Sequence, residues 1–297
     1  MHPQQSKIII FCGKGGVGKT TLSLSMALRH AESGKKVVVV SSHPLKELAV
    51  AVSLDGIAEA FPTAARNLFV VHLNSKELLA DEVRKNFPSQ WVADKVLDSN
   101  IYQSLVEVAP GLKEFYFLVR MQQLAERKAT GTPDFDILLW DAPASGHFVS
   151  TLHSARNFET FLTGPLASAG ADLARFFSGT SHITLLPITT LEEMAIEEMA
   201  EMCAKLETEF ELKAAAVLLN LVSPLAMASE VDIDALRGRS DPALHFALER
   251  GIIERERAAY VRQKVPVEQV AVERLSHWTS DLDLLAQLGR SLDKISI

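Results

Sequence analysis

A glycine-rich segment near the amino terminus constrains the fold of this chain more than any other feature of the sequence. The segment Gly13–Thr21 satisfies the pattern G-x-x-x-x-G-K-[ST]. It directly follows the apolar run Lys7–Cys12 and leads into the amphipathic stretch Thr20–Ala31. A strand, a glycine-rich loop and a helix in this order predict a phosphate-binding loop, because the glycines let successive backbone N–H groups face the phosphates.

The side chains of this loop predict how a nucleoside triphosphate is held. Lys19 is expected to reach the β- and γ-phosphates, and the Thr20 hydroxyl is expected to bind Mg²⁺. Thr21 is placed to donate a hydrogen bond to the α-phosphate. The predicted cofactor-binding residues of the loop are Gly13, Lys14, Gly15, Gly16, Val17, Gly18, Lys19, Thr20 and Thr21.

A second lysine, Lys14, lies inside the loop, where an ordinary phosphate-binding loop does not need one. Within its own loop, we expect nucleotide to be the only anionic partner of Lys14. Two interpretations remain open from the residues alone. Lys14 is either a solvated loop lysine or a lysine that crosses a dimer interface to the nucleotide of the partner.

Short β-branched runs alternate with helical stretches along the chain. Most of these runs are continuous in Val, Ile and Leu, which is typical of parallel strands covered by helices on both faces. We therefore predict an α/β fold, with a doubly wound, mainly parallel sheet flanked by helices. The predicted strands are Lys7–Cys12, Lys36–Ser41, Leu68–Leu73, Phe135–Trp140, His182–Ile188, Ala214–Asn220 and Val265–Val270.

A long segment without a convincing strand interrupts this alternation. It covers about residues 75–130, and its helical patterning predicts an insertion between two strands of the sheet. The chain is expected to form a single P-loop domain, residues 1–297, that carries this helical insertion. The aromatic run Phe115–Phe117 within it suits core packing and contact with a protein client equally well.

The run Phe135–Asp141 ends in an acid, as expected for a strand that delivers a carboxylate to the metal. Asp141 is therefore predicted to bind Mg²⁺, directly or through water. The alternative is that Asp141 only caps the next turn. The segment from Asp141 to His147 is expected to sense the γ-phosphate, with Gly146 as a hinge. For His147, a contact within this segment is favoured over an ordinary surface position.

Composition limits the partners and the compartment. The net charge of −7 argues against a protein that covers nucleic-acid phosphates. The two cysteines, Cys12 and Cys203, form no CxxC pair, which fits a reducing cytoplasm. No apolar run approaches the roughly 20 residues needed to span a bilayer. We expect a soluble cytoplasmic protein with no nucleic-acid partner and no stable membrane insertion.

Several motifs together resemble the ATPase family of arsenite pumps (ArsA) and tail-anchored-protein targeting factors, in its bacterial anion-transporting branch. That family belongs to the deviant Walker A class of P-loop proteins with MinD and ParA. Asn220 resembles in position the asparagine that contacts adenine in the family. The other motifs are K-G-G-V-G-K-T-T at 14–21, the loop Ser41–Leu45, D-A-P-A-S-G-H at 141–147, Ala109–Glu114 and Glu192–Met194.

This resemblance implies a switch-type ATPase that works with Mg-ATP and hydrolyses it to ADP and phosphate. It implies a homodimer or pseudodimer that closes over two ATP molecules, with Lys14 reaching the opposite nucleotide. The helical regions would then rearrange as a surface for a protein client. An arsenite sensor needs clustered thiols and a zinc-bridged dimer needs a CxxC, and the cysteine pattern supports neither. The acidic tail Asp281–Leu288 argues against a membrane-bound MinD-like role.

One position departs from the family pattern. His43 stands where the family has the aspartate that positions the attacking water. A neutral imidazole can accept a proton from water, or it can donate to the γ-phosphate instead. The catalytic residues expected from the resemblance are Lys14, Lys19, His43 and Asp141. Weak turnover is therefore one outcome, and a nucleotide-binding subunit in a heterodimer with a paralogous ATPase is the alternative.

Overall fold

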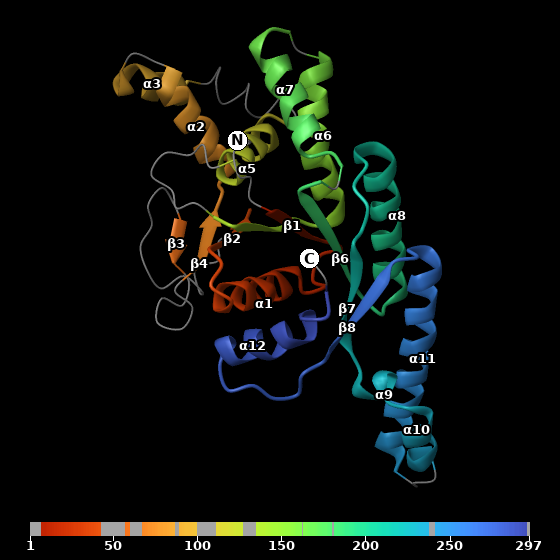
Figure 1. Ribbon diagram of the computed structural model, residues 1–297. Helices are drawn as coiled ribbons and strands as arrows, with labels where there is room; N and C mark the ends of the chain where they lie inside the picture. Colours follow the sequence, from red (N-terminus) through yellow and green to blue (C-terminus); the bar gives the residue numbers. More distant parts are fainter. Residues whose placement is uncertain are drawn as a thin grey trace.

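An eight-stranded sheet runs through the centre of the computed structural model, in the order β3-β4-β2-β5-β1-β6-β7-β8 (Figure 1). The short β3 pairs antiparallel with β4, and every other pair of neighbours is parallel. The predicted α/β class with a mainly parallel sheet is confirmed. The strands are β1 (Lys7–Cys12), β2 (Val37–Ser41), β3 (Ile57–Glu59), β4 (Leu68–His72), β5 (Ile137–Asp141), β6 (Ile183–Thr190), β7 (Ala216–Val222) and β8 (Glu268–Glu273). The structure describes residues 7–42, 57–59, 67–86, 89–99, 111–126, 135–161, 163–179, 181–237 and 241–295.

The central strands are apolar on both faces because helices cover both faces. In β1, Ile8 and Ile10 face one buried cluster, while Ile9 and Phe11 face another. The first cluster contains residues of α5 (Leu112–Ala125), α6 (Ser145–Phe161), α7 (Pro165–Phe176), α8 (Glu193–Phe210) and α11 (Pro242–Lys264). The second is covered by α1 (Lys19–Glu32) and α12 (Asp281–Leu292). A continuous Val/Ile run in the sequence thus indicates a strand that lies between two layers of helices.

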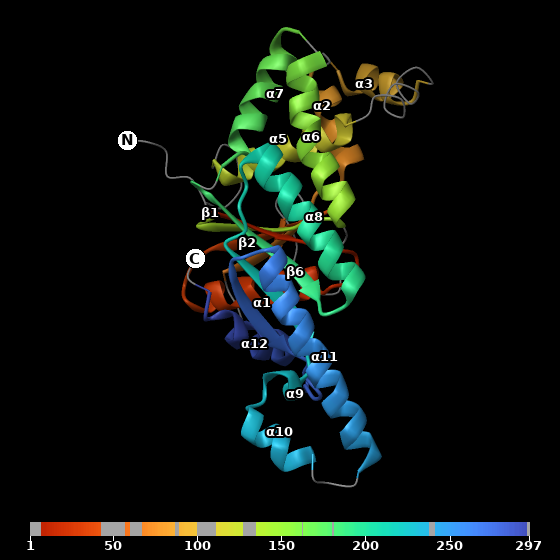
Figure 2. The same cartoon turned by 90° about the vertical axis from the view of Figure 1, so that its right-hand side faces the viewer.

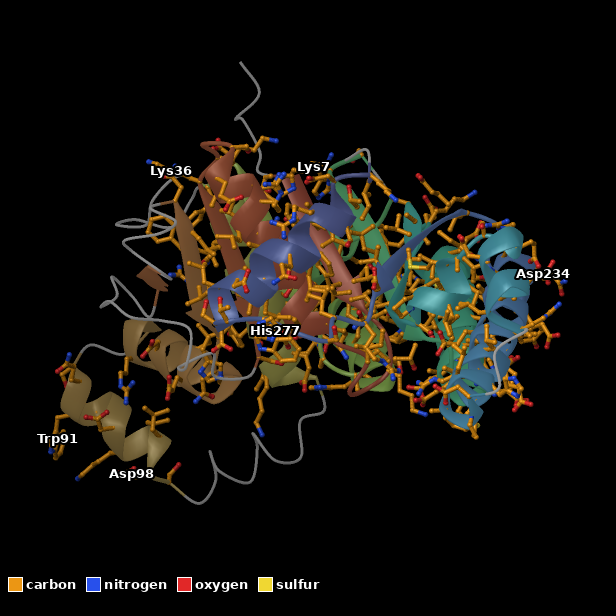
Figure 3. All side chains as sticks on the ribbon, turned by 90° about the horizontal axis from the view of Figure 1, so that it is seen from below. Lys7, Lys36, Trp91, Asp98, Asp234 and His277 are labelled. Carbon is orange, nitrogen blue, oxygen red and sulfur yellow. The ribbon has the colours of Figure 1, made fainter. Side chains whose placement is uncertain are left out.

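The predicted helical insertion is present as α2 (Ser75–Asn86), α3 (Gln90–Leu97) and α5. No strand occurs in the described residues of that stretch. Phe115 and Phe117 of α5 are buried, so of the two interpretations left open for them core packing is correct. Figure 3 shows Trp91 and Asp98, which belong to this region, at one end of the molecule and Asp234 at the other.

The connection between β7 and β8 forms a second helical extension. It consists of α9 (Pro224–Met227), α10 (Glu230–Arg237) and the long α11 (Figure 2). The sequence predicts a strand from Val265, but β8 begins at Glu268 because Val265 is the C-cap of α11 and Pro266 follows it. The three-residue β3 is not predicted by the sequence. No helix in the described part of the chain is long and apolar enough to cross a bilayer.

Helices α6 and α7 pack so closely that one position between them admits only glycine. A Cβ added at Gly170 of α7 would lie 2.5 Å from the backbone nitrogen of Glu159 and 2.8 Å from the carbonyl oxygen of Ala155. Both neighbours are backbone atoms of α6, so a side-chain rotation cannot relieve the contact. The two helices would have to move apart.

We predict that Gly170→Ala lowers the free energy of unfolding by about 1–3 kcal/mol, since overpacking forces backbone shifts of this cost. Urea unfolding followed by circular dichroism measures the change. Gly146→Ala in α6 is the matched control, because its added Cβ would meet nothing within 4 Å. The control should be neutral or stabilising by up to about 1 kcal/mol. An equal loss in both variants would show that close packing at Gly170 is not the cause.

Candidate functional site

The candidate site lies where three parallel strands end at one edge of the sheet. In the register of the sheet, Asp141 at the end of β5 stands opposite Phe11 of β1 and Ser41 of β2. The glycine-rich loop follows β1 directly, and α1 begins at Lys19. Ligands of parallel α/β sheets bind at this carboxyl edge.

Glycine is required at two positions of the loop. Gly13 has a φ of 144°, and a Cβ there would lie 2.2 Å from the carbonyl oxygen of Ile188. Gly18 has a φ of 94°, and its Cβ would lie 2.3 Å from Nδ2 of Asn220. A side chain at either position would be strained by the backbone angle and blocked by a neighbour. The loop therefore runs close against β6 and β7, which hold its shape.

The ammonium group of Lys19 lies over the loop. Its Nζ donates to the carbonyl oxygens of Gly13 at 3.0 Å and Lys14 at 2.9 Å. Burial lowers the pKa of Lys19, and the nearby carboxylates of Asp141 and Glu198 oppose that shift. A partly desolvated cation that donates hydrogen bonds to two neutral carbonyls is prepared to bind an anion at the loop.

Thr20 and Asp141 meet across the edge of the sheet, as the sequence predicts. The Thr20 hydroxyl donates to Oδ2 of Asp141 at 2.6 Å, and the Ser41 hydroxyl donates to the same oxygen at 3.3 Å. Asp141 is 6% exposed. Hydroxyl and carboxylate oxygens beside a phosphate loop fit Mg²⁺, which takes one or two protein oxygens and completes its shell with phosphate and water. Elsewhere in the described ranges, no cluster of three or more His, Cys, Asp or Glu side chains suits a metal.

Asn220 fixes the loop from the neighbouring strand. It is buried near the end of β7, and its Nδ2 donates to the carbonyl oxygen of Val17 at 2.8 Å. This contact sets the orientation of the amide, because a carbonyl accepts only from the NH₂ side. The sequence points to Asn220 through the family resemblance alone, and its bond to the loop is a finding of the structure.

Lys14 has an anionic partner within its own chain, so our expectation that only nucleotide would pair with it is wrong. Its Nζ lies 3.7 Å from Oε2 of Glu198 in α8. The other oxygen of Glu198 accepts a hydrogen bond from the Ser145 hydroxyl, at the start of α6. Glu198 thus connects the phosphate loop with the segment after Asp141. The sequence offers little signal for this, because α8 carries several similar glutamates.

The segment predicted as a sensing loop is shorter than expected. Helix α6 begins at Ser145, so Gly146 and His147 belong to its first turn and only residues 142–144 form a loop. His147 is exposed, and its Nε2 lies 3.4 Å from Oε1 of Glu114 in α5. This contact joins the segment to the helical insertion.

The remaining predicted residues are His43, the insertion motif and the two cysteines. His43 lies outside the described residues, as do Ala109 and Pro110 of the insertion motif. Cys12 is buried in the core at the end of β1. Burial raises the pKa of its thiol, and raises that of Cys203 to about 12. Both thiols are therefore protonated at neutral pH.

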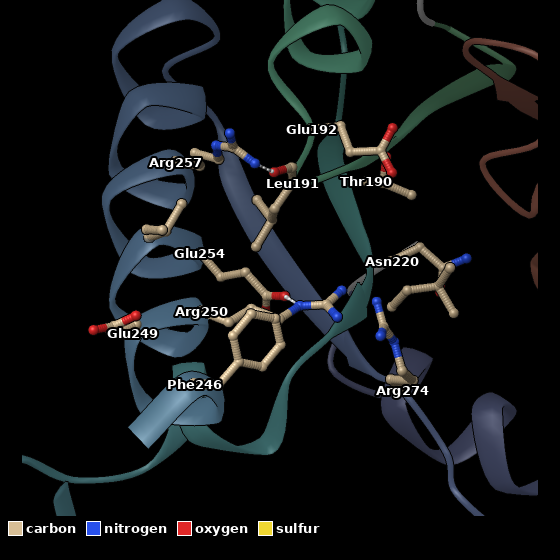
Figure 4. A pocket seen from close by; sticks show the side chains of 12 residues that line it. Thr190, Leu191, Glu192, Asn220, Phe246, Glu249, Arg250, Glu254, Arg257 and Arg274 are labelled. Atoms are coloured by element: carbon tan, nitrogen blue, oxygen red, sulfur yellow. Dashed lines mark hydrogen bonds and ion pairs between the residues drawn. The ribbon is translucent and has the colours of Figure 1, made fainter. Parts of the chain in front are cut away.

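A cavity of about 290 Å³ opens beside Asn220, at the ends of β6 and β7 (Figure 4). Phe246 and Arg250 of α11 lie on one side of it, and Asn220 and Arg274 on the other. Asn220 lines this cavity and also bonds to Val17 of the loop, so the cavity lies beside the phosphate-binding loop. Among the residues that line the cavity, the sequence predicts only Asn220 as a nucleotide contact, although Glu192 belongs to one of the family motifs.

Comparison with known proteins places these features in a family. The model of a family described as anion-transporting ATPase matches residues 6–211. A putative arsenical pump-driving ATPase of Prosthecochloris vibrioformis is 31% identical over 150 residues, which are 49% of this chain and 35% of that protein. ATPase GET3C of Arabidopsis thaliana is 26% identical over 163 residues, 50% of this chain and 41% of the relative. An arsenical pump-driving ATPase of Acidiphilium multivorum is 25% identical over 253 residues, 77% of this chain and 41% of the relative. The chain thus covers less than half the length of each of these three proteins.

We predict that Asn220→Ala destabilises the nucleotide-free protein by about 1–3 kcal/mol, because it removes the donor to the Val17 carbonyl, which lies in a buried residue. Asn220→Asp should cost more, since a carboxylate would then face that oxygen. Urea unfolding without nucleotide measures both. If the aspartate variant were as stable as the unmodified protein, the bond would not hold the loop.

Proposed function

This chain belongs to the anion-transporting ATPase family, and on that premise we propose that it binds Mg-ATP and hydrolyses it to ADP and phosphate in the cytoplasm. The observation that carries the proposal is the position of Lys19. Its ammonium group lies over the loop with two carbonyl partners, which a triphosphate would replace with charged oxygens. Such charge-assisted bonds are stronger than the ones they replace.

The phosphates would lie against the loop and the amino end of α1. The backbone N–H groups there lack helical partners and face an incoming anion. Thr20 and Asp141 would hold the metal, and Mg²⁺ when bound offsets charge on the β- and γ-phosphates. The bond between these two side chains brings their oxygens together before any ligand arrives.

The base would lie beside Asn220. Since Nδ2 donates to Val17, the other side of the amide, Oδ1, is left as an acceptor. An acceptor at this place suits the exocyclic amino group of adenine and opposes the carbonyl of guanine. This supports ATP over GTP as the ligand.

Lys14 would act on the nucleotide of a partner chain in an ATP-bound dimer. In the single chain it is drawn toward Glu198 at 3.7 Å, and both side chains are 37% exposed. Half-exposed pairs contribute only about 0–1 kcal/mol, so a triphosphate of the partner could take Lys14 from Glu198. Ser145 shares the same carboxylate, so the exchange would also affect the start of α6.

A protein client would bind at the helical insertion, as the family resemblance implies. Trp91 of α3 is 67% exposed, which leaves apolar surface there for a partner.

His43 favours a second candidate, a nucleotide-binding subunit with weak or absent turnover, in a heterodimer with a paralogous ATPase. Hydrolysis needs a group that orients the attacking water, and histidine here replaces the aspartate of the family pattern. As an imidazole, His43 would serve only in its neutral form.

We predict that the purified chain releases phosphate from Mg-ATP, and that Lys19→Ala lowers this turnover by about 100-fold or more, since it removes charge stabilisation of the transferred phosphate. A phosphate-release assay measures it. Lys35→Ala is the matched control, because Lys35 is an exposed lysine just beyond α1.

Tight ATP binding without release, restored by His43→Asp, would favour the heterodimer subunit. The absence of both binding and release from the unmodified chain would contradict the proposal.

A further inference from the structure

The cavity beside Asn220 is lined in part by apolar side chains, and these have no role in binding the phosphates. Its volume of about 290 Å³ is near the lower limit of ligand pockets, about 300–1,000 Å³. A cavity of this size holds a flat ring system rather than a whole nucleotide. Asn220, which lines the cavity, also bonds to Val17 of the loop, so the cavity lies next to the place where the phosphates would bind.

Leu221 enters this cavity because β7 is irregular there. Between Leu219 and Val222, β7 has one residue more than the facing strand has between Ala271 and Glu273, which is a β-bulge. Leu221 has a φ of 59°, in the left-handed region that a branched side chain disfavours. It is also 42% exposed, unlike its buried neighbours on the strand. Strain of this kind at the edge of a cavity points to a function.

Phe246 faces the same cavity from α11. It is 68% exposed, although phenylalanine is an apolar residue that folding normally buries. Ile253, 46% exposed, lines the cavity from the same face of the helix, two turns further on. Figure 4 shows the ring of Phe246 at the rim of the cavity, across from Asn220.

Helix α11 is fixed in place, so the position of Phe246 is set by the fold. The buried carboxylate of Glu254 accepts from the backbone nitrogen of Ser223 at 2.6 Å and from Arg250 at 3.0 Å. Arg257 donates to the carbonyl oxygen of Leu191 at 2.8 Å. These bonds join α11 to the segments that follow β6 and β7.

We propose that Phe246 and Leu221 form a clamp that holds the purine base of the nucleotide between them. The clamp rests on the proposed function, since the phosphates of the same nucleotide would occupy the loop. Phe246 and Leu221 come from different elements and line the same shallow cavity, and each is more exposed than its residue type favours, which suits contact with the two faces of a flat base. The base would cover both side chains. Because Phe246 belongs to α11, nucleotide binding would also change the contacts of that helix.

The test compares a ligand that has a base with one that has none. Affinities for ATP and for inorganic tripolyphosphate are measured by calorimetry, with Mg²⁺ present. Phe246→Ala should weaken ATP binding about tenfold, as expected for loss of one stacking contact. It should leave tripolyphosphate binding unchanged, because that ligand does not reach the cavity.

Two further variants separate the clamp from general damage to the fold. Leu221→Asn keeps a residue that tolerates the left-handed backbone, so it should weaken ATP binding without lowering the unfolding temperature. Phe161→Ala is the matched control, because Phe161 is a 77% exposed phenylalanine at the end of α6 and does not line the cavity. It should bind both ligands as the unmodified chain does.

The clamp is overturned if Phe246→Ala and Leu221→Asn bind ATP normally, or if they weaken tripolyphosphate binding equally. It is also overturned, with the phosphate site intact, if the unmodified chain binds ATP and tripolyphosphate with the same affinity. If the unmodified chain binds neither ligand, the proposed function fails and the clamp fails with it.

Discussion

The hydrogen bond between Thr20 and Asp141 is the contact on which the site depends. At 2.6 Å it joins the first turn of α1 to the end of β5. It can form only because β1, which leads into α1, lies next to β5 in a parallel register. The parallel sheet thus brings together a hydroxyl and a carboxylate that are far apart in the sequence. Ser41 from β2 adds a third side chain at the same point.

Around this contact, the loop is held rigidly by close packing, whereas the Lys14–Glu198 ion pair can break and form again with other partners. Gly13 and Gly18 fix the loop, because each is held against backbone or a buried side chain with no space for a Cβ. The Lys14–Glu198 ion pair spans 3.7 Å, and both side chains are 37% exposed. Breaking it therefore costs little free energy, and Lys14 can take another anionic partner. Glu198 also accepts from Ser145. A rigid loop beside an easily broken ion pair suits a protein whose surface changes with bound nucleotide.

The sequence predicts local features of this fold well. β1, the loop and α1 follow from contiguous residues, and Asp141 follows from an apolar run that ends in an acid. The sequence does not predict the features that depend on tertiary contacts. Glu198 is one glutamate among several on α8, and only the packing of α8 against the sheet selects it. Phe246 belongs to a long helix whose position beside Asn220 depends on the path between β7 and β8. The sequence places the start of β8 too early, because Val265 ends helix α11 and Pro266 follows it.

On the proposed function, Lys14 would complete the site of a partner chain in a dimer closed by Mg-ATP. Mixing two variants tests it most directly: Lys14→Ala, which keeps Asp141, and Asp141→Asn, which keeps Lys14. Each should turn over ATP poorly alone, and the mixture should recover phosphate release, because a mixed dimer contains one complete site. If the mixture forms dimers with Mg-ATP yet stays inactive while the unmodified chain is active, Lys14 does not act across the interface.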